Sequence, residues 1–427
     1  MEGFQELEDY ATEPLSKVEL EFSSTKVSHS VLSQYLKLLY KSRTVEELHN
    51  NIADSAVFLN ALDTFSSCFV EVLPGSIPDS AKVSFDLQDS KRWGVGFGIN
   101  SNSEGGSFSM SASLKNLRAK ADLSIAEVEY SPRSKTIGYS INHYDRMFVP
   151  LKWESLYTFQ NSHKKLTQNV AENLWGGSLA FVSSDGTNSI KLGSFSRTNK
   201  IAVEHASLEL LKEILPVSTK NFVSYKYTYD TVEDEEEPRA GHTLEVLNEL
   251  AFSKDTQFHR LEVAGRKFYS LTENLVLKGS CNLGVIVPWA FTNSHINDRY
   301  IGKYKKGFSS YGGRAPPADQ NLRGKFQPEG DDLGKMSELN FEGKLQFYNT
   351  PLLSAIGVVP FIYGNLLCAE PHKCSSPKSY LKDYGRGSIG FGLDWKTSLG
   401  TVEFSYSAKT FKKPQDVSAE FQVIFSD

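Results

Sequence analysis

A cation set among glycines and aromatic residues marks the long segment 288–338. The motif consists of Gly312, Gly313, Leu322, Arg323, Gly324 and Phe326. The guanidinium of Arg323 presents its N–H donors in a fixed fork, so it binds well only where several acceptors converge on it. Such acceptors would be available if the segment folded back into a polar lumen, where Phe326 could also pack against a wall. The motif therefore predicts noncovalent chemistry, with an internal lid inside a membrane β-barrel.

Residues that could catalyse a reaction or hold a metal do not form a recognised pattern. The histidines are scattered without the spacing of metal ligands, and neither a Gly-x-Ser-x-Gly turn nor a phosphate-binding loop occurs. The four cysteines contain no Cys-x-x-Cys pair. Cys368 and Cys374 could bridge one loop, although free thiols are the favoured state. We therefore expect no enzyme, no metal and no cofactor.

Composition favours strands and gives no support for a nucleic-acid partner. The 427 residues carry a net charge of −5, so there is no basic excess to attract phosphates. Aromatic residues make up 12% of the chain, and 31 glycines stand against four methionines, which suits strands and tight turns. No run of about 18 apolar residues occurs, which excludes a transmembrane helix but not spanning strands.

The start of the chain bears on location. Residues 1–15 are expected to form a flexible tail, and Met1–Pro14 is acidic and lacks the regions of a secretory signal. A bacterial outer-membrane barrel needs such a signal to cross the inner membrane, whereas a mitochondrial barrel made in the cytosol does not. The missing signal is therefore compatible with a mitochondrial barrel and unfavourable for a bacterial one.

Residues 16–90 predict a small α+β domain with a mixed sheet. The expected elements are a strand near 18–22, helices at 28–40 and from Thr44 onwards, and strands at 69–73 and 82–88. Thr44 and Glu47 form a capping box, which indicates a helix start. The order is β-α-α-β-β. One interpretation is that the sheet edge accepts another extended chain; an equally weighted one is that the domain is a spacer.

Residues 91–427 contain sixteen segments in which apolar and polar residues alternate. The segments are 93–100, 108–114, 123–130, 137–141, 153–159, 175–181, 190–195, 222–229, 242–250, 258–269, 275–287, 339–347, 356–366, 389–395, 402–411 and 418–425. An even number within roughly 8 to 26 is typical of single-chain membrane barrels. Short links alternate with long ones, and a helical stretch at 205–215 interrupts one long link.

The first of these segments places glycine at every second position. It reads Trp93, Gly94, Val95, Gly96, Phe97, Gly98, Ile99 and Asn100. One face is bulky and the other almost empty, so cross-strand side-chain pairs are missing on the empty face. The strand could be the weak side of a seam that opens, or its glycines could serve curvature or close packing.

In this order and spacing, three motifs resemble those of the outer-membrane β-barrel assembly family. That family comprises the barrel subunit of the bacterial assembly complex and its counterpart in the mitochondrial sorting and assembly machinery. The first motif is an inner-side turn with Asp230, Pro238 and Gly241, and the second is the lid motif. The third runs from 387–393 to the final strand, where the family's sorting signal is in register with Asp416, Phe421 and Val423; the implied last gate strand also includes Ser418 and Phe425.

The resemblance implies a mainly β fold, a sixteen-stranded antiparallel transmembrane β-barrel over 91–427 with a lid loop at 288–338. One small α+β polypeptide-transport-associated (POTRA) domain precedes it at 16–90. The implied function is to fold and insert β-barrel precursors through a lateral gate between the first strand, 93–100, and the last. Templating by β-strand addition would replace catalysis.

The same resemblance implies partners and a location. The substrates would be β-barrel precursor proteins such as porin and the main import pore, with metaxin-type accessory subunits and membrane lipid around them. An inner-membrane organising complex is a further implied contact. The protein would be integral to the mitochondrial outer membrane, with the POTRA domain facing the intermembrane space. The alternatives are a passive outer-membrane pore, or a plastid or bacterial member of the family.

Three departures from the family pattern concern these sites. Lys325 is inserted before Phe326, which puts the docking of the aromatic ring in doubt. Ile362 stands where the family often has Asn or Asp, so a lumenal acceptor for Arg323 is not assured from that strand. Ser418 occupies the glycine place of the sorting signal and leaves that place small and polar.

Overall fold

The computed structural model describes residues 14–23, 25–62, 64–102, 105–132, 135–148, 153–165, 170–183, 185–201, 208–232, 238–289, 296–300, 308–310, 335–348, 357–370, 385–397, 400–412 and 417–426. The lid motif and Asp416 lie outside these residues. The chain forms two compact units, one of residues 1–160 with 181–184, the other of residues 161–180 with 185–427.

The N-terminal domain has the predicted element order. It comprises β1 (Lys17–Phe22), α2 (His29–Tyr35), the 3₁₀ turn η1 (Leu39–Lys41), α3 (Val45–Ala61), β2 (Phe65–Pro74) and β3 (Ser80–Asp89). The sheet order is β1-β3-β2, in which β3 pairs parallel with β1 and antiparallel with β2. The small α+β domain with a mixed sheet is thus confirmed.

Local sequence explains these elements. The hydroxyl of Thr44 accepts the N–H of Glu47 at 3.2 Å, so α3 begins at the predicted N-cap, while the Glu47 carboxylate accepts the N–H of Arg43, one residue before the cap, at 2.8 Å. The single helix expected at 28–40 is wrong in its second half. The N–H of Leu39 donates to the carbonyl of Leu36 at 3.0 Å, and a hydrogen bond over three residues is that of a 3₁₀ helix rather than an α-helix.

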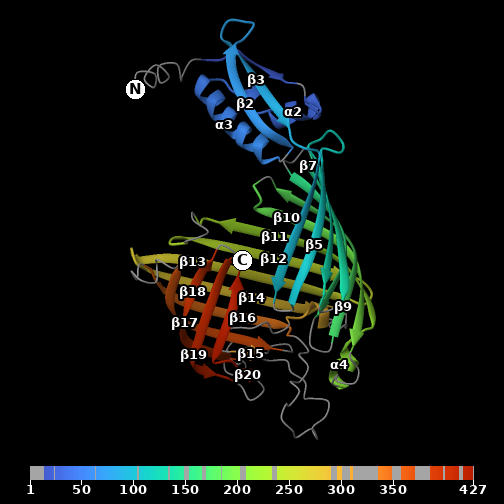
Figure 1. The fold of residues 1–427 in the computed structure, drawn as a ribbon, viewed down its shortest axis with the longest axis vertical. Helices are drawn as coiled ribbons and strands as arrows, with labels where there is room; N and C mark the ends of the chain where they lie inside the picture. Colours follow the sequence, from blue (N-terminus) through green and yellow to red (C-terminus); the bar gives the residue numbers. More distant parts are fainter. Residues whose placement is uncertain are drawn as a thin grey trace. The chain divides into compact units, whose positions relative to one another are not determined.

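The rest of the chain forms a sheet of sixteen strands, as predicted, and its order runs from β21 to β4. Its strands are β4 (Trp93–Asn102), β5 (Gly105–Lys115), β6 (Leu123–Ser131), β7 (Thr136–Phe148), β8 (Trp153–Lys165), β9 (Val170–Ser183), β10 (Asn188–Ile201), β11 (Val217–Asp230), β12 (Gly241–Phe252), β13 (Gln257–Thr272), β14 (Leu275–Pro288), β16 (Ser337–Phe347), β17 (Val358–Glu370), β18 (Gly385–Thr397), β19 (Gly400–Phe411) and β21 (Phe421–Ser426). Figure 1 shows the consecutive strands β10, β11 and β12 of this sheet side by side. The ladders described in this sheet are antiparallel, and each pair of neighbouring strands is consecutive among the strands of the sheet.

The strands separate an exposed apolar face from a face that is polar or packed. On β17, Ile362 is 50% exposed whereas Phe361 and Tyr363 are each 2% exposed. Alternation of this kind follows from the period of two in a strand. The polar or packed side, here called the inner face, carries buried charges such as Lys220, Glu249 and Lys344.

Two short pieces lie between the sheet strands. Helix α4 (Leu208–Glu213), within the stretch predicted to be helical, buries Leu210 and Ile214 against Val170. The segment after β14 holds the 3₁₀ turn η3 (Ile296–Asp298) and β15 (Phe308–Ser310). None of the helices in the described part of the chain has both the length and the apolar character needed to span a bilayer.

The final strand is shorter than predicted. The expected segment 418–425 divides into β20 (Val417–Ser418), which pairs with β15, and β21, which pairs with β19. Ser418 therefore lies outside the sixteen-stranded sheet, and its assignment to the last barrel strand is wrong. The cause lies in β19, where the register with β18 shifts at Ile389/Gly390, since a β-bulge of this kind disrupts the ladder and bends the strand.

Candidate functional site: the terminal strands and the lid segment

Strand β4 has an inner face almost without side chains. Its glycines lie opposite serines of β5, in the pairs Gly94↔Ser113, Gly96↔Ser111 and Gly98↔Ser109. A methyl group added to Gly96 would meet only the hydroxyl of Ser111, at 2.7 Å. Among the described residues, no aromatic ring lies within 4 Å of a Cβ at these glycines, so packing against the described strands does not explain them.

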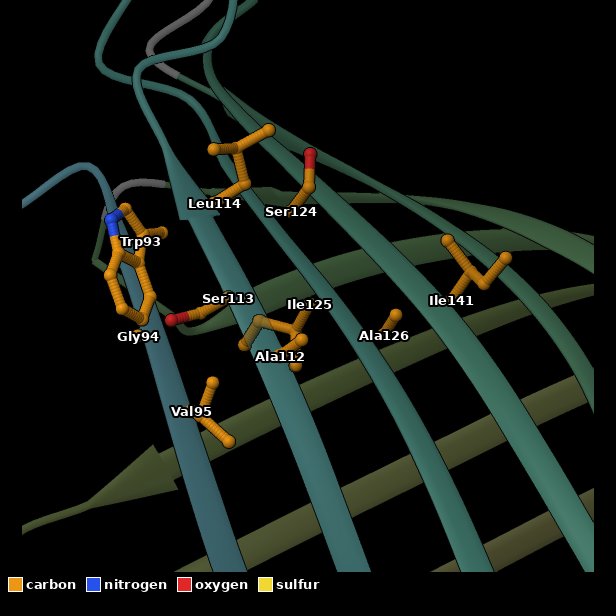
Figure 2. A pocket seen from close by; sticks show the side chains of 10 residues that line it. All are labelled: Trp93, Gly94, Val95, Ala112, Ser113, Leu114, Ser124, Ile125, Ala126 and Ile141. Carbon is orange, nitrogen blue, oxygen red and sulfur yellow. The ribbon is translucent and has the colours of Figure 1, made fainter.

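The opposite face of β4 is strongly apolar. Phe97 is 80% exposed, and ladder partners extend its row through Met110, Val128 and Tyr139. The row of Val95, Ala112, Ala126 and Ile141 contains two small residues, which leave a hollow of about 350 Å³ (Figure 2).

Strand β21 presents the same alternation. Phe421 and Val423 are exposed, while Gln422 between them is buried on the inner face. Phe425 lies opposite Val402 in the ladder with β19. Of the predicted last-strand residues, the structure therefore places Phe421, Val423 and Phe425 in one strand, and it places Ser418 in β20.

The predicted inner-side turn lies between β11 and β12. Asp230 accepts the N–H of Val232 at 2.8 Å, and Gly241 has φ +101°, where a Cβ would lie 2.5 Å from the carbonyl oxygen of Thr231. Glycine is thus required by both conformation and space. Pro238 follows in the same link, and the neighbouring Arg239 donates to the carbonyl of Glu273 at 3.2 Å.

The described parts of the lid segment are attached at its base. Tyr300 and Lys335 exchange backbone hydrogen bonds of 2.9 and 2.8 Å, which brings the two ends of the loop together. Ile362 stands where the family often has a polar acceptor, and it lies on the exposed apolar face. Its side chain therefore does not face the interior, where an acceptor for Arg323 would have to lie.

Sequence reasoning missed a buried group of charges. Arg197 on β10, Lys220 on β11 and Glu249 on β12 lie on the inner face and surround Asp298 of η3. Each is an inward position of an alternating strand, and that signal alone could have marked it. The pairing of these side chains with Asp298 could not be predicted, because it depends on the register of the strand ladders and on where the segment after β14 returns to the sheet.

A family model, the Omp85 superfamily domain, matches residues 80–426, a range that includes β4, β21 and the lid segment. The chain belongs to the Omp85 superfamily. Membership together with the fold indicates an outer-membrane protein, and it confirms the expected family at this coarser level.

Solved structures agree with Omp85 membership. BamA of Haemophilus ducreyi lacking POTRA domains 1–3 matches with a TM-score of 0.73 and 14% identity over 95% of this chain and 83% of that chain. CdiB of Acinetobacter baumannii matches with a TM-score of 0.50 and 11% identity over 97% of this chain and 74% of that chain. At such identities the likeness is one of fold. No curated protein matches the chain.

Proposed function

We propose that this Omp85 protein folds and inserts β-barrel precursors into the mitochondrial outer membrane, through a lateral gate formed by β4 and β21. The observation that carries the proposal is the bare inner face of β4, where, within the described part of the chain, three glycines meet serine hydroxyls and no larger group. The strand order begins with β21 and ends with β4. Pairing of these two strands would close the sheet into a barrel.

The physical argument concerns the cost of an open edge. In lipid, unpaired backbone groups find no water, so a barrel seam must be paired at almost all times. A seam that opens must therefore be weak in side-chain contacts and must be refilled by another strand. Glycines make it weak, because they add no cross-strand pairs and gain conformational freedom when released.

An incoming precursor would fill the seam by β-augmentation. Main-chain hydrogen bonds to β4 would supply affinity, and the exposed row of Val95, Phe97 and Ile99 would fix the register, since a slip of one residue turns every side chain to the wrong face. Later strands would then pair in turn. No covalent step and no nucleotide are required.

Location and partners complete the proposal. The proposed location is the mitochondrial outer membrane, with the POTRA-like domain, residues 16–90, facing the intermembrane space. Porin and the main import pore would be the substrates, and metaxin-type subunits would be accessory. Arg323 of the lid would bind acceptors in the lumen.

Reconstitution tests the proposal. The purified chain in liposomes should speed the assembly of an unfolded porin without nucleotide. The matched pair Arg323→Ala and Arg314→Ala, in the same segment, separates the lid from loss of any cation: both should insert as barrels, and only Arg323→Ala should lower assembly. A steady, ungated conductance with no assembly would instead indicate a passive pore, and normal assembly by Arg323→Ala would remove the lid role.

A further inference from the structure

Besides the contacts at its base, the described lid segment contacts the inner face of the sheet and the short strand β20, which precedes the last sheet strand. One attachment is a set of buried side chains around Asp298, on the inner face of β9 to β13. The other is the backbone ladder between β15 and β20, which precedes the last strand. Residues 299–307 connect the two.

Asp298 lies in a socket of cations. Its carboxylate is 1% exposed and accepts two hydrogen bonds from Arg197, at 2.7 and 2.9 Å, and one from Lys220 at 2.9 Å. The fork-to-fork pairing with arginine fixes direction as well as distance. Burial alone would raise the pKa of Asp298, but the charges of Lys220 and Arg197 and their hydrogen bonds hold that pKa well below the usual carboxyl value.

The cations of the socket are themselves held in place. Lys220 donates to Glu249 at 2.7 Å, and Arg197 lies 3.3 Å from Glu172, which also accepts from Asn297 at 2.8 Å. The Nη2 of Arg260 donates to the backbone carbonyl of Asp298. Removal of the Asp298 charge would leave buried cations without their shared partner, which is strongly unfavourable.

Aromatic rings form the floor of the socket. Phe195 and Phe222 stack with centroids 5.9 Å apart, and the ammonium of Lys220 lies 5.0 Å from the ring centre of Phe258. Gly193 makes room for Phe222, since a Cβ there would lie 2.3 Å from the ring. Rings on one side and η3 on the other exclude water, which strengthens the ion pairs.

The second attachment reaches the last strand. β15 pairs with β20 through Phe308↔Ser418 and Ser310↔Val417, and β21 begins at Phe421. The N–H of Ser407 on β19 donates to the carbonyl of Glu420 at 2.7 Å, just before β21. A two-residue ladder is weak by itself, so it needs an independent anchor to persist.

We propose that Asp298 is a positioning residue for the last strand. Its socket fixes η3 on the wall of β10 to β12, and the connected β15 then holds β20 and sets where β21 begins. This inference rests on the proposed function, because the strand so positioned is one side of the gate. We call the Asp298 socket together with the β15–β20 ladder the clasp. Release of the clasp would free β20, so that a precursor strand could replace β21.

A cross-linking experiment tests the clasp apart from activity. Cysteines replace Ser310 and Val417 in a chain whose four native cysteines are serine, and the rate of disulfide formation in liposomes reports the β15–β20 ladder. Asp298→Asn should slow it about tenfold, because the buried pair is broken. Lys220→Met, which keeps the Arg197 pair, should slow it less.

The matched control is a second buried ion cluster, whose hydrogen bonds and ion pairs among the described residues lie within β16, β18 and β19 and reach neither η3 nor β15. Asp394 on β18 accepts from Lys344 on β16 at 2.8 Å and is similarly buried. Asp394→Asn should leave the cross-linking rate unchanged, although it also breaks a buried pair. Equal slowing by Asp394→Asn would show general loosening and overturn the clasp.

Porin assembly is measured on the same proteins. The proposal predicts that Asp298→Asn changes the assembly rate several-fold while Asp394→Asn changes it little. An unchanged cross-linking rate in Asp298→Asn overturns the clasp, whatever the assembly rate. Slower cross-linking with unchanged assembly overturns the positioning role. If the parent protein assembles no porin, the proposed function fails, and the cross-linking rates alone then decide whether the clasp exists.

Discussion

Strands β4 and β18 share a glycine alternation but differ in what lies over the glycines. In β18 a Cβ on Gly392 would lie 2.4 Å from the ring of Phe361, and one on Gly390 would lie 2.8 Å from the ring of Tyr363. In β4 the corresponding neighbours are serine hydroxyls. The same sequence pattern thus makes a seat for aromatic rings in one strand and an empty face in the other.

The difference is one of cohesion. Burying a large apolar side chain contributes about 1.5–3 kcal/mol, and Tyr363 also bonds the hydroxyl of Ser407 at 2.6 Å. Rings on β17 therefore fasten β17, β18 and β19 together. Among the described residues, no ring packs between β4 and β5 in this way. A gate strand that must separate from its partner requires such weak side-chain contact.

The largest expected effect on the free energy of unfolding comes from removing an aromatic ring from β17, where the rings pack against β18 and β19. Phe361→Ala should lower the free energy of unfolding by about 3–5 kcal/mol, because it leaves a cavity over Gly392 and removes the ring 3.8 Å from the Lys344 ammonium. Phe97 on β4 faces lipid, which fills the space of the ring, so Phe97→Ala should lower this free energy only by the transfer term, about 1.5 kcal/mol. Urea unfolding in lipid vesicles measures both; equal losses would abolish the distinction.

Adding a side chain to each glycine strand sharpens the comparison. Gly392→Val should destabilise by about 1–3 kcal/mol, since its Cβ would meet the carbonyl of Phe404 at 2.2 Å. Gly96→Val should stabilise by about 0.5–1 kcal/mol, since only a hydroxyl must move. The same unfolding measurement applies, and Gly96→Val should also slow porin assembly. Destabilisation by both substitutions would mean that β4 is packed as tightly as β18.

Removing the single hydroxyl of Tyr363 should have a smaller effect on the free energy of unfolding. Tyr363→Phe should cost about 1 kcal/mol, because the buried hydroxyl of Ser407 loses its partner. Tyr406→Phe, on the exposed face of β19, is the control and should fall within about 0.5 kcal/mol. A cost equal to that of the control would show that the ring, and not its hydrogen bond, fastens these strands.

The smallest effect concerns how the β4 side is held instead, at the turn between β5 and β6. Ala119 accepts the N–H of Ser28 at 3.0 Å, and Ala121 is buried in the core of the N-terminal domain. Asp122 braces this turn by accepting from the backbone and side chain of Arg118, at 3.0 and 3.2 Å.

Acid should loosen this turn. Burial raises the pKa of Asp122, but the hydrogen bonds from Arg118 offset it and leave the pKa below its usual value. A depressed folded-state pKa means that the stabilisation is complete above about pH 4 and is lost as pH falls through the folded-state value. Asp122→Asn should therefore lower the free energy of unfolding by about 1 kcal/mol or less at neutral pH. It should also reduce the fall of this free energy as the pH drops below about 4. An equal fall in Asp122→Asn and in the parent protein would show that this carboxylate does not brace the turn.

The sequence predicted most of the fold because alternation is a local signal. All sixteen segments became strands of one sheet, and the capping box at Thr44 placed α3. The helix at 28–40 was overestimated, because helical spacing alone does not show that the chain tightens into a 3₁₀ turn at Leu39–Lys41. The division of the last strand at Ser418 depended on a bulge in β19 and on a distant segment, which periodicity cannot reveal.

The candidate site was predicted unevenly for the same reason. The glycines of β4 were visible in the sequence, but β18 carries them too, and only the neighbouring strands distinguish the two. The socket of Asp298 joins residues from β10, β11 and the lid segment, so no local pattern contains it. The lid motif around Arg323 lies outside the described residues and stays a prediction.

The most direct test is a reversible bond between the two terminal strands. Cysteines at Gly96 and Gln422, both on the inner face, replace residues in the cysteine-free chain, with Ser111→Ala to make room. The account predicts a disulfide that blocks porin assembly in liposomes until a reductant restores it. Full assembly by the oxidised, cross-linked protein would contradict the gate.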